Sequence, residues 1–254
     1  MKHIPVMKKQ SVNALDIFPN GKYIDATFGF GGHSTEILSK LGENGCLFAI
    51  DKDLDAIKDI DQNILEDERF TLKHGCFSSL DSFTQEWGIH GSVNGILFDL
   101  GVSSYHFDNP KRGFSFNGDG LIDMRFDQTQ GEAAFNWINN ASESDLANVI
   151  WKYGEEKFSK RIAKEIIKER DKNKIMSTIE LANLIEKTIP RTKYKKHKAT
   201  KTFQAIRIFT NNELEILKEA LLKSYSILAP KGRLVLITYH SLEDKVIKNF
   251  IKHT

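Results

Sequence analysis

A short apolar strand that runs into glycines most limits what this chain can fold into. Residues 23–33 read YIDATFGFGGH, with an acid, Asp25, at the end of the strand and a glycine-rich turn that opens a helix. This order brings bare backbone and the N–H groups of a helix start close to a ligand, which suits nucleotide-like cofactors. The turn alone is a weak signal. It becomes informative through a second acid, Asp51, about twenty residues later, and a further strand that ends in Asp99.

Strand and helix patterns alternate over the first hundred residues. Apolar runs predict further strands, and i, i+3, i+4 spacing of apolar residues predicts helices between them. Such alternation predicts an α/β fold with a parallel, doubly wound sheet, whose ligands bind at the carboxyl ends of the strands. Asp25, Asp51 and Asp99 all fall at such ends. The expected strands are 46–50, 70–72 and 93–99, and the expected helices are 34–41, 53–65 and 77–87.

From about Tyr105 the character of the chain changes. Residues 111–126 are rich in glycine and aromatics with little periodicity, which indicates an ordered loop. The sheet pattern resumes at 232–238. We therefore expect one domain built from 1–104 and 208–254, interrupted by an all-helical domain at 105–207. Helices are expected at 132–139, at 142–171 with an interruption at Gly154, at 177–188, at 212–228 and from the fifth strand to the last residue.

The overall charge is nearly balanced, because 36 basic residues face 34 acidic ones. Any contact with nucleic acid must therefore come from a local patch. Between Lys187 and Asn212 the chain carries basic residues and no acid, with Tyr194, His197 and Phe203 interleaved. This composition suits a segment that contacts phosphates and stacks on bases, although a solvated loop is the plain alternative. The basic residues are Lys187, Arg191, Lys193, Lys195, Lys196, Lys198, Lys201 and Arg207.

Several classes of protein are disfavoured by what the sequence lacks. Cys46 and Cys76 sit in apolar runs without paired spacing, which fits buried thiols in a reducing compartment. The first residues lack the apolar region of a signal peptide, and no run approaches the ~20 apolar residues of a membrane span. We therefore expect a cytoplasmic protein. The histidines show no grouping typical of a metal site, so no metal is expected. His240, after the fifth strand, is the histidine of most interest, with a structural role as the alternative.

The glycine turn and Asp51 together indicate which class of cofactor the chain binds. A dinucleotide fingerprint needs a third glycine where this chain has Ser34, which counts against NAD and FAD. An acid-terminated strand, G-x-G-G and an acid after the next strand are the arrangement of S-adenosylmethionine methyltransferases. Asp51 would accept hydrogen bonds from both ribose hydroxyls. The alternative is a tight turn and a surface acid that caps the helix at Asp53.

The segment that follows the fourth strand is the second candidate site. Asp99 could orient the cofactor or accept a proton from an attacking amine, which needs little activation once its lone pair is aimed at the methyl carbon. DNA amino-methyltransferases usually carry an Asp/Asn/Ser-Pro-Pro-aromatic motif here, and this chain has Asp99-Leu100-Gly101-Val102 instead. The alternative is an aspartate that closes a β-turn.

Long collinear motifs make the chain resemble the RsmH (MraW) family, bacterial methyltransferases that modify the exocyclic N4 of a cytidine in the decoding centre of 16S ribosomal RNA. The resemblance covers nearly the whole chain. It implies a class I (Rossmann-like) methyltransferase sheet with an inserted helical substrate domain, S-adenosyl-L-methionine as cofactor, and 16S rRNA in the small subunit as partner, with no DNA and no membrane. The motifs are YIDATFGFGGHS at 23–34, AIDKD at 49–53, ILFDLGVSS at 96–104, RGFSF and DMRFD within 112–127, YGEEKFSKRIA at 153–163, HKATKTFQAIRI at 197–208 and ITYHSLEDK at 237–245.

The resemblance also implies roles for single residues. Most of the residues with an implied role would contact the methyl donor. At one of these positions the chain departs from the family pattern, because His106 stands where the family usually has glutamine after proline. By their location, Asp99, Ser103 and His240 are the candidate catalytic residues, and Phe114 and Phe116 are candidate neighbours of a flipped base. The implied cofactor-binding residues are Gly31, Gly32 and His33 around the donor, Asp51 at its ribose, Phe77 at its adenine, Asp99 completing the pocket, and His106.

Other interpretations remain open. A small-molecule or DNA methyltransferase would share the cofactor site but would not require the basic helical insertion. A ribosome-assembly factor that binds RNA and has lost catalysis would not need the donor. Family members normally continue beyond the position of Thr254 with the last strands of the sheet, and without them the fifth strand would keep an exposed edge. The sequence leaves a homodimer open.

Overall fold

The computed structural model describes residues 5–58, 60–190 and 197–253. The chain forms two compact units, which we call the sheet unit, Met1–Gly101 with Leu214–Thr254, and the helical unit, Val102–Glu213. Each unit has its own buried apolar clusters. The assignment of 1–104 with 208–254 to the cofactor and of 105–207 to the substrate stays a prediction.

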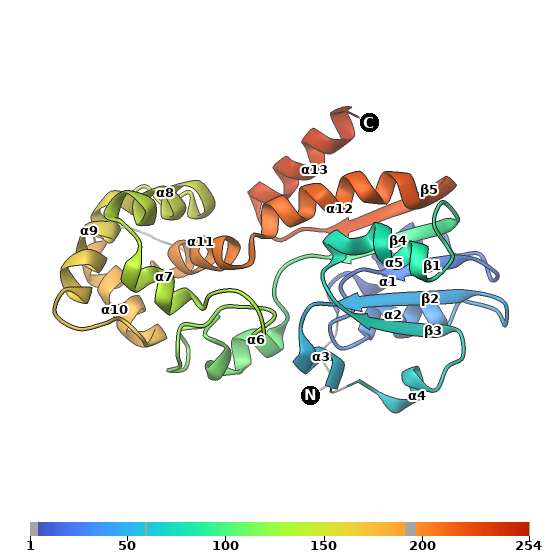
Figure 1. The fold of residues 1–254 in the computed structure, drawn as a ribbon, viewed down its shortest axis with the longest axis horizontal. Coiled ribbons are helices and arrows are strands. Elements are labelled where there is room, and N and C mark those ends of the chain that lie inside the picture. Colours follow the sequence, from blue (N-terminus) through green and yellow to red (C-terminus); the bar gives the residue numbers. More distant parts are fainter. Residues whose placement is uncertain (1–4, 59, 191–196, 254) are drawn as a thin grey trace. The chain divides into compact units, whose positions relative to one another are not determined.

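The sheet unit contains a parallel sheet with the strand order β3-β2-β1-β4-β5 (Figure 1). Every pairing between neighbours is parallel, which confirms the expected α/β class. Three strands end in an acid: β1 in Asp25, β2 in Asp51 and β4 in Asp99. The strands are β1 Lys22–Asp25, β2 Cys46–Asp51, β3 Phe70–His74, β4 Val93–Asp99 and β5 Leu228–Ile237.

Helices cover both faces of this sheet, and successive side chains of each strand point to opposite faces. Ile24, Ile50 and Ile96 are buried in one cluster with residues of α5 (Leu80–Glu86), α12 (Glu213–Ile227) and α13 (Ser241–His253). Their strand neighbours point the other way. Tyr23, Ala49 and Leu97 are buried in a second cluster with residues of α1 (Lys8–Ala14), α2 (Gly32–Leu38) and α4 (Gln62–Leu65).

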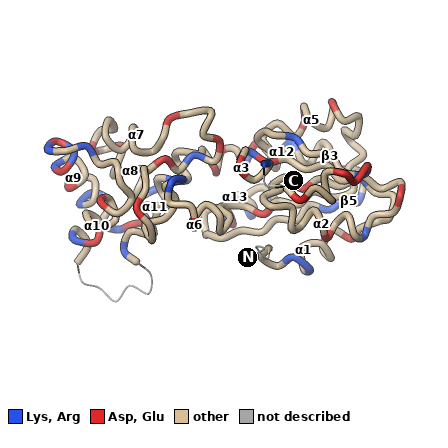
Figure 2. The backbone as a smooth tube through the Cα atoms, turned by 90° about the horizontal axis from the view of Figure 1, so that it is seen from below, with Lys and Arg blue, Asp and Glu red and all other residues tan. Residues whose placement is uncertain are grey.

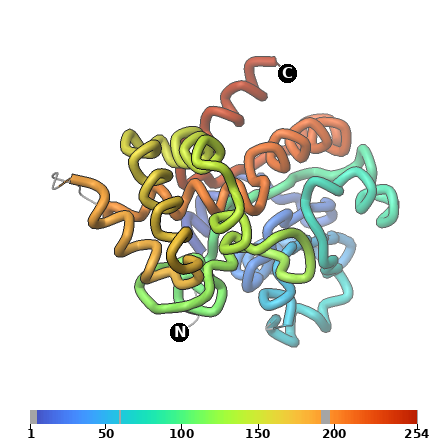
Figure 3. Tube along the Cα trace, turned by 60° about the vertical axis from the view of Figure 1, so that its left-hand side comes forward, coloured from blue at the N-terminus to red at the C-terminus, as the bar shows by residue number. Residues whose placement is uncertain are grey.

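The helices of the helical unit pack together (Figures 1 and 3), and buried apolar side chains from its described residues form a cluster between them. The interruption expected at Gly154 is present, because α8 ends there and Glu155 adopts a left-handed conformation before α9 begins. A Cβ at Gly154 would lie 2.5 Å from the carbonyl oxygen of Lys201, so glycine permits close packing of α8 on α11. The elements are α6 Ser104–Asp108, η2 Pro110–Arg112, α7 Ala134–Asn140, α8 Glu143–Gly154, α9 Ser159–Arg170, α10 Thr178–Thr188 and α11 Thr200–Asn211.

Several boundaries differ from the sequence expectations. The helix expected at 53–65 is divided into α3 (Leu54–Lys58) and α4, because Asp61 accepts a hydrogen bond from the Asn63 N–H and starts a new helix. The helix expected at 77–87 begins as a 3₁₀ turn, η1 (Phe77–Ser79). The helices α1, α6 and α11 were not expected. Within the described ranges, no helix has both the length and the apolar composition that a membrane span requires.

Candidate active site

The glycine turn between β1 and α2 presents its backbone to open space. Gly29 and Gly31 have φ angles of 55° and 74°, a region that glycine enters at no steric cost. A Cβ built on Gly29 would meet no atom within 4 Å, so this stretch of backbone is accessible to a ligand. A Cβ on Gly31 would lie 2.8 Å from the Phe28 ring, and one on Gly32 would lie 2.2 Å from Cγ of Pro5. The turn therefore needs glycine for conformation at the first two positions and for packing at the last two.

Asp51, at the end of β2, closes this turn. Its Oδ2 accepts a hydrogen bond from the Gly29 N–H at 2.6 Å, and its Oδ1 accepts one from the Asp53 N–H at 2.7 Å. Burial raises the pKa of Asp51 to about 6, although the hydrogen bonds from Asp53 and Gly29 act in the opposite direction. The alternative offered by the sequence, an acid that caps the helix start, is met only in part: Asp51 bonds the residue before α3, and Oδ1 of Asp53 accepts the Asp55 N–H in the first turn at 2.9 Å. Each carboxylate oxygen has two lone pairs, so these contacts are compatible with further donors such as ribose hydroxyls.

Asp25, at the end of β1, is fully buried beneath the turn. Its Oδ2 accepts a hydrogen bond from Oγ of Ser34 at 2.7 Å, and its Oδ1 accepts one from the Thr27 N–H at 3.3 Å. Burial raises the pKa of this carboxyl to about 7, and the charges of Asp99 and Asp51 contribute in the same direction. Ser34 therefore stands at the third glycine position because its hydroxyl satisfies a buried acid.

Asp99, at the end of β4, is brought together with His33 and Tyr239. Its Oδ1 accepts a hydrogen bond from the Tyr239 hydroxyl at 2.8 Å, and its Oδ2 lies 3.8 Å from Nδ1 of His33. Its backbone N–H donates to Oγ1 of Thr27 at 2.7 Å. Sequence reasoning missed Tyr239. Tyr239 lies two residues beyond the end of β5, whereas the acids are the last residues of their strands, and its partner is 140 positions earlier, so no local pattern indicated it.

His240 is held by its own helix start. Its Nε2 lies 3.2 Å from Oε1 of Glu243, while Oε2 of the same carboxylate accepts from the backbone N–H groups of Tyr239 at 2.8 Å and His240 at 3.3 Å. Glu243 is 3% exposed. These contacts favour the structural alternative for His240, and its catalytic role stays a prediction.

Phe77 begins η1 and is partly buried. Its ring meets the edge of Phe98 at a centroid distance of 5.4 Å and an interplanar angle of 89°. The ring thus belongs to the apolar cluster on the α5 face of the sheet. The expected contact with adenine stays a prediction.

Ser103 and His106 belong to the helical unit and pair with each other at the start of α6. Nδ1 of His106 lies 3.1 Å from the Ser103 N–H and 2.9 Å from Ser103 Oγ. The two residues form a capping box in which histidine replaces the usual Glu or Gln. His106 is 7% exposed and packs edge-on against Phe114 and Phe126. Its expected contact with the methyl donor stays a prediction.

The aromatic residues of the loop after α6 have different environments. Phe114 is 5% exposed and stacks on Phe126 at 5.4 Å within the core, which argues against a place beside a flipped base for this ring. Phe116 is only partly buried, and its ring lies 4.5 Å from that of His197. Phe116 remains the better candidate for stacking. A pattern without periodicity could not distinguish these two rings.

Part of the basic segment serves the helix ends. Nζ of Lys198 donates to the carbonyl oxygens of Ile189 at 2.9 Å and Glu186 at 3.2 Å, which supports the end of α10. Nζ of Lys201 donates to the Glu155 carbonyl at 2.9 Å, at the end of α8.

The remaining basic residues divide into three groups. Arg207 forms a two-bond ion pair with Glu213, and Lys187 is exposed on α10. Figure 2 shows further basic positions on α9, interspersed with acidic ones. The other four residues named from the sequence lie outside the described ranges: Arg191, Lys193, Lys195 and Lys196.

A doubly wound parallel sheet with a glycine turn after β1 and acids at the ends of β1, β2 and β4 defines a class I methyltransferase. The chain belongs to the MraW methylase family, whose model matches residues 1–254. It is 48% identical over 250 residues to Ribosomal RNA small subunit methyltransferase H of Coxiella burnetii (strain Dugway 5J108-111), and 47% identical to that of strain RSA 331 / Henzerling II. Both matches cover 98% of this chain and 81% of the relative.

Solved structures give weaker similarities. An rRNA methylase from Streptococcus thermophilus is 19% identical with a TM-score of 0.31, covering 48% of this chain and 71% of that one. Fibrillarin from Aeropyrum pernix, in complex with S-adenosyl-L-methionine, is 10% identical with a TM-score of 0.30, covering 67% and 72%. The fold assignment above rests on the strand order and the family match.

The cofactor of the family is S-adenosyl-L-methionine, and the residues of the sheet unit suit it. The backbone of Gly29 faces open space, and the carboxylate of Asp51 stands beside it. A carboxylate is the acceptor that a ribose diol requires, while the clustered acids Asp25, Asp51 and Asp99 favour a cationic ligand. The donor set therefore fits a nucleoside that carries positive charge.

Proposed function

We propose that this protein transfers a methyl group from S-adenosyl-L-methionine to the exocyclic N4 of a cytidine in the decoding centre of 16S rRNA. The observation that carries this proposal is the family match over the whole chain, together with relatives named Ribosomal RNA small subunit methyltransferase H. The placement of Asp99 at the end of β4, beside His33 of the glycine turn, supports an amine as the acceptor.

The sheet unit would hold the methyl donor. Gly31, Gly32 and His33 would wrap it, and Asp51 would accept hydrogen bonds from its ribose. Asp99 would complete the pocket. From the resemblance, Phe77 would contact the adenine, and His106 is a further expected cofactor-binding residue. When bound, this cofactor supplies an electrophilic methyl carbon attached to a sulfonium.

The reaction needs one new bond and one proton acceptor. In-line attack by the N4 lone pair on the methyl carbon would form the N–C bond as the S–C bond breaks, giving N4-methylcytidine and S-adenosylhomocysteine. The amine then releases one proton. The carboxylate of Asp99 is the candidate acceptor, with Ser103 and His240 as further candidates for holding the amino group. No covalent intermediate on Cys46 or Cys76 is required.

The helical unit would bind the RNA. The target base must leave its stack before its amino group can reach a methyl donor, and Phe116 is the candidate ring beside it. Basic residues around the segment 187–207 would contact phosphates. Lys198 and Lys201 support helix ends, so Lys187 and the basic residues between Arg191 and Lys196 are the better candidates.

Mapping of methylated nucleosides in 16S rRNA by mass spectrometry, from cells with and without the protein, tests the proposal directly. We expect loss of one N4-methylcytidine in the decoding centre without the protein. Unchanged rRNA would reject the proposed site.

Purified protein separates the competing functions. Small subunits from cells without the protein should accept the methyl group, whereas free cytidine and duplex DNA should not. Preferential methylation of DNA or cytidine would favour the alternative enzymes. Binding of small subunits with no calorimetric binding of S-adenosyl-L-methionine would instead indicate a non-catalytic assembly factor.

A further inference from the structure

The neighbouring strands β4 and β5 place an aromatic hydroxyl beside the proposed proton acceptor. In the parallel register Asp99 is paired with Ile237, and Tyr239 follows two residues later. The Tyr239 hydroxyl donates to Oδ1 of Asp99 at 2.8 Å. The hydroxyl thus engages one carboxylate oxygen, while the other is turned toward His33 of the glycine turn.

The backbone of Tyr239 is fixed by the start of α13. Oε2 of the buried Glu243 accepts the Tyr239 N–H at 2.8 Å, and Oγ1 of Thr238 donates to Oδ1 of Asp244 at 2.6 Å. The ring lies beside Gly101, where an added Cβ would be at ordinary contact distance, 3.5 Å, from Cδ2 of Tyr239. The fixed backbone and the hydrogen bond to Asp99 together hold the hydroxyl in place.

The hydroxyl, more than the ring, is the part of Tyr239 with a specific partner. The residue is 51% exposed, so its ring contributes little to the buried core. Partial burial of the residue, followed by the hydrogen bond to Asp99, raises the pKa of Tyr239. The phenol therefore remains a hydrogen-bond donor at neutral pH.

We infer that Tyr239 is a positioning residue: its hydroxyl fixes the rotation of the Asp99 carboxylate and keeps Oδ2 directed toward the glycine turn, where the amine of the substrate would release its proton. This inference rests on the proposed function. In this inference the segment 238–244 positions the Asp99 carboxylate through Tyr239. That role does not require His240 or Glu243 to contact the substrate.

Tyr239→Phe removes only the hydroxyl and is the direct test. We expect kcat on small subunits to fall about tenfold, with less than threefold change in KM for the subunit and in the calorimetric Kd for S-adenosyl-L-methionine. The matched control is Tyr225→Phe, because Tyr225 lies on α12 of the same unit and is 69% exposed. A kcat for Tyr239→Phe within twofold of the control would overturn the inference.

A double-mutant cycle with Asp99→Ala tests whether the hydroxyl acts through the carboxylate. In the Asp99→Ala background, Tyr239→Phe should change kcat by less than twofold. Equal effects in both backgrounds would show that Tyr239 acts elsewhere.

The same cycle measured by thermal unfolding does not depend on activity. The loss of melting temperature caused by Tyr239→Phe should disappear when Asp99 is alanine, and an unchanged loss would overturn the inference. If the wild-type protein fails to methylate small subunits, the proposed function fails, whereas the unfolding cycle still measures the contact. Should Tyr239→Phe fold poorly, a comparison of Glu243→Gln with Glu243→Ala replaces it. Glutamine keeps an acceptor for the Tyr239 N–H, so Glu243→Gln should retain kcat and Glu243→Ala should lose it. Equal kcat values for the two variants would contradict the inference.

Discussion

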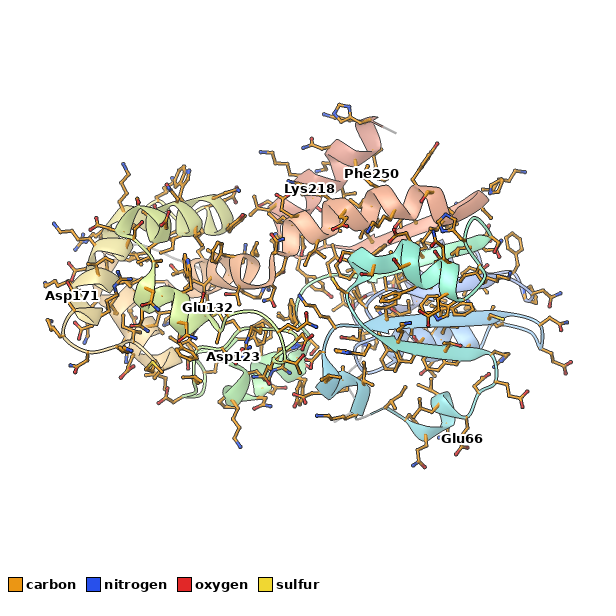
Figure 4. The ribbon with its side chains drawn as sticks, in the orientation of Figure 1. Glu66, Asp123, Glu132, Asp171, Lys218 and Phe250 are labelled. Carbon is orange, nitrogen blue, oxygen red and sulfur yellow. The ribbon has the colours of Figure 1, made fainter. Side chains whose placement is uncertain are left out.

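The sheet unit and the helical unit both bury aspartates, but they stabilise them in different ways. Asp25 of the sheet unit accepts from the Ser34 hydroxyl and the Thr27 N–H, and burial raises its pKa to about 7. Asp123 of the helical unit also loses solvation, yet two hydrogen bonds from the Arg125 guanidinium hold its pKa below the usual range. Figure 4 labels Asp123 in the loop before α7.

The difference indicates what each acid does. An aspartate paired with arginine has its charge compensated within the protein, which is the arrangement of a structural contact. In the part of the chain that the structure describes, Asp25 accepts from a serine hydroxyl and a backbone N–H, and Asp51 accepts from backbone N–H groups, so both favour the approach of positive charge. The arginine that compensates the charge of Asp123 therefore indicates a structural role for this acid. Asp25 and Asp51 have neutral donors among the described residues, which indicates that they face a ligand.

The largest expected effect concerns the pH dependence of stability in Asp25→Asn. The pKa of Asp25 rises from 3.8 to about 7 on folding, so its stabilising contribution is complete below pH 4 and is lost as the pH rises through 7. The free energy of unfolding of the wild type relative to Asp25→Asn should therefore fall between pH 4 and 8, by about 4 kcal/mol at most. Urea unfolding at several pH values measures it. If the free energies of unfolding of the two proteins changed in parallel with pH, the proposed difference between the aspartates of the two units would be contradicted.

Asp99→Asn should lower kcat about 100-fold, or about 2.7 kcal/mol, because the amide is a poor proton acceptor. Its melting temperature should stay close to that of the wild type. The control is Asp16→Asn, which alters an exposed contact with Arg233 in the same unit. A large loss of stability with intact kcat would place Asp99 among the structural acids.

Asp51→Asn keeps an oxygen for the turn but loses a negative charge and one acceptor for the ribose. The Kd for S-adenosyl-L-methionine should rise more than tenfold, or about 1.4 kcal/mol. Isothermal titration calorimetry measures it, with Glu66→Gln on the exposed end of α4 as control. An unchanged Kd would leave Asp51 with its backbone contacts alone.

Asp123→Asn should lower the free energy of unfolding by about 1 kcal/mol at pH 7 while leaving the Kd for the cofactor unchanged. Because folding lowers the pKa of Asp123, its contribution is present above 3.8 and is lost as the pH falls through the folded value. The sign of this pH dependence is opposite to that of Asp25. Glu132→Gln, an exposed change nearby, is the control; a shared sign for both aspartates would contradict the distinction.

The sequence was most informative where one periodicity dominates. Strand-helix alternation predicted the parallel sheet, and the rule that ligands meet the carboxyl ends of strands placed Asp25, Asp51 and Asp99 together. The cofactor class followed from Ser34 and the acid after β2.

Other features depend on contacts that no local pattern contains. The helix α11 was missed because its basic residues suggested a loop, although Phe203 and Ile206 have helical spacing and are buried. Lys198 and Lys201 looked like phosphate ligands, whereas they support the ends of distant helices. Tyr239 was missed because its partner lies 140 positions earlier.

Ser34 also bears on how easily this fold could change cofactor. A single substitution, Ser34→Gly, would complete the glycine pattern of a dinucleotide-binding turn, but it would remove the hydroxyl that bonds the buried carboxylate of Asp25. Leaving that group without its donor would cost about 1–3 kcal/mol. The shortest mutational route toward NAD or FAD therefore begins with a loss of stability, and a chain of this kind is held to its methyl donor by the acid beneath the turn.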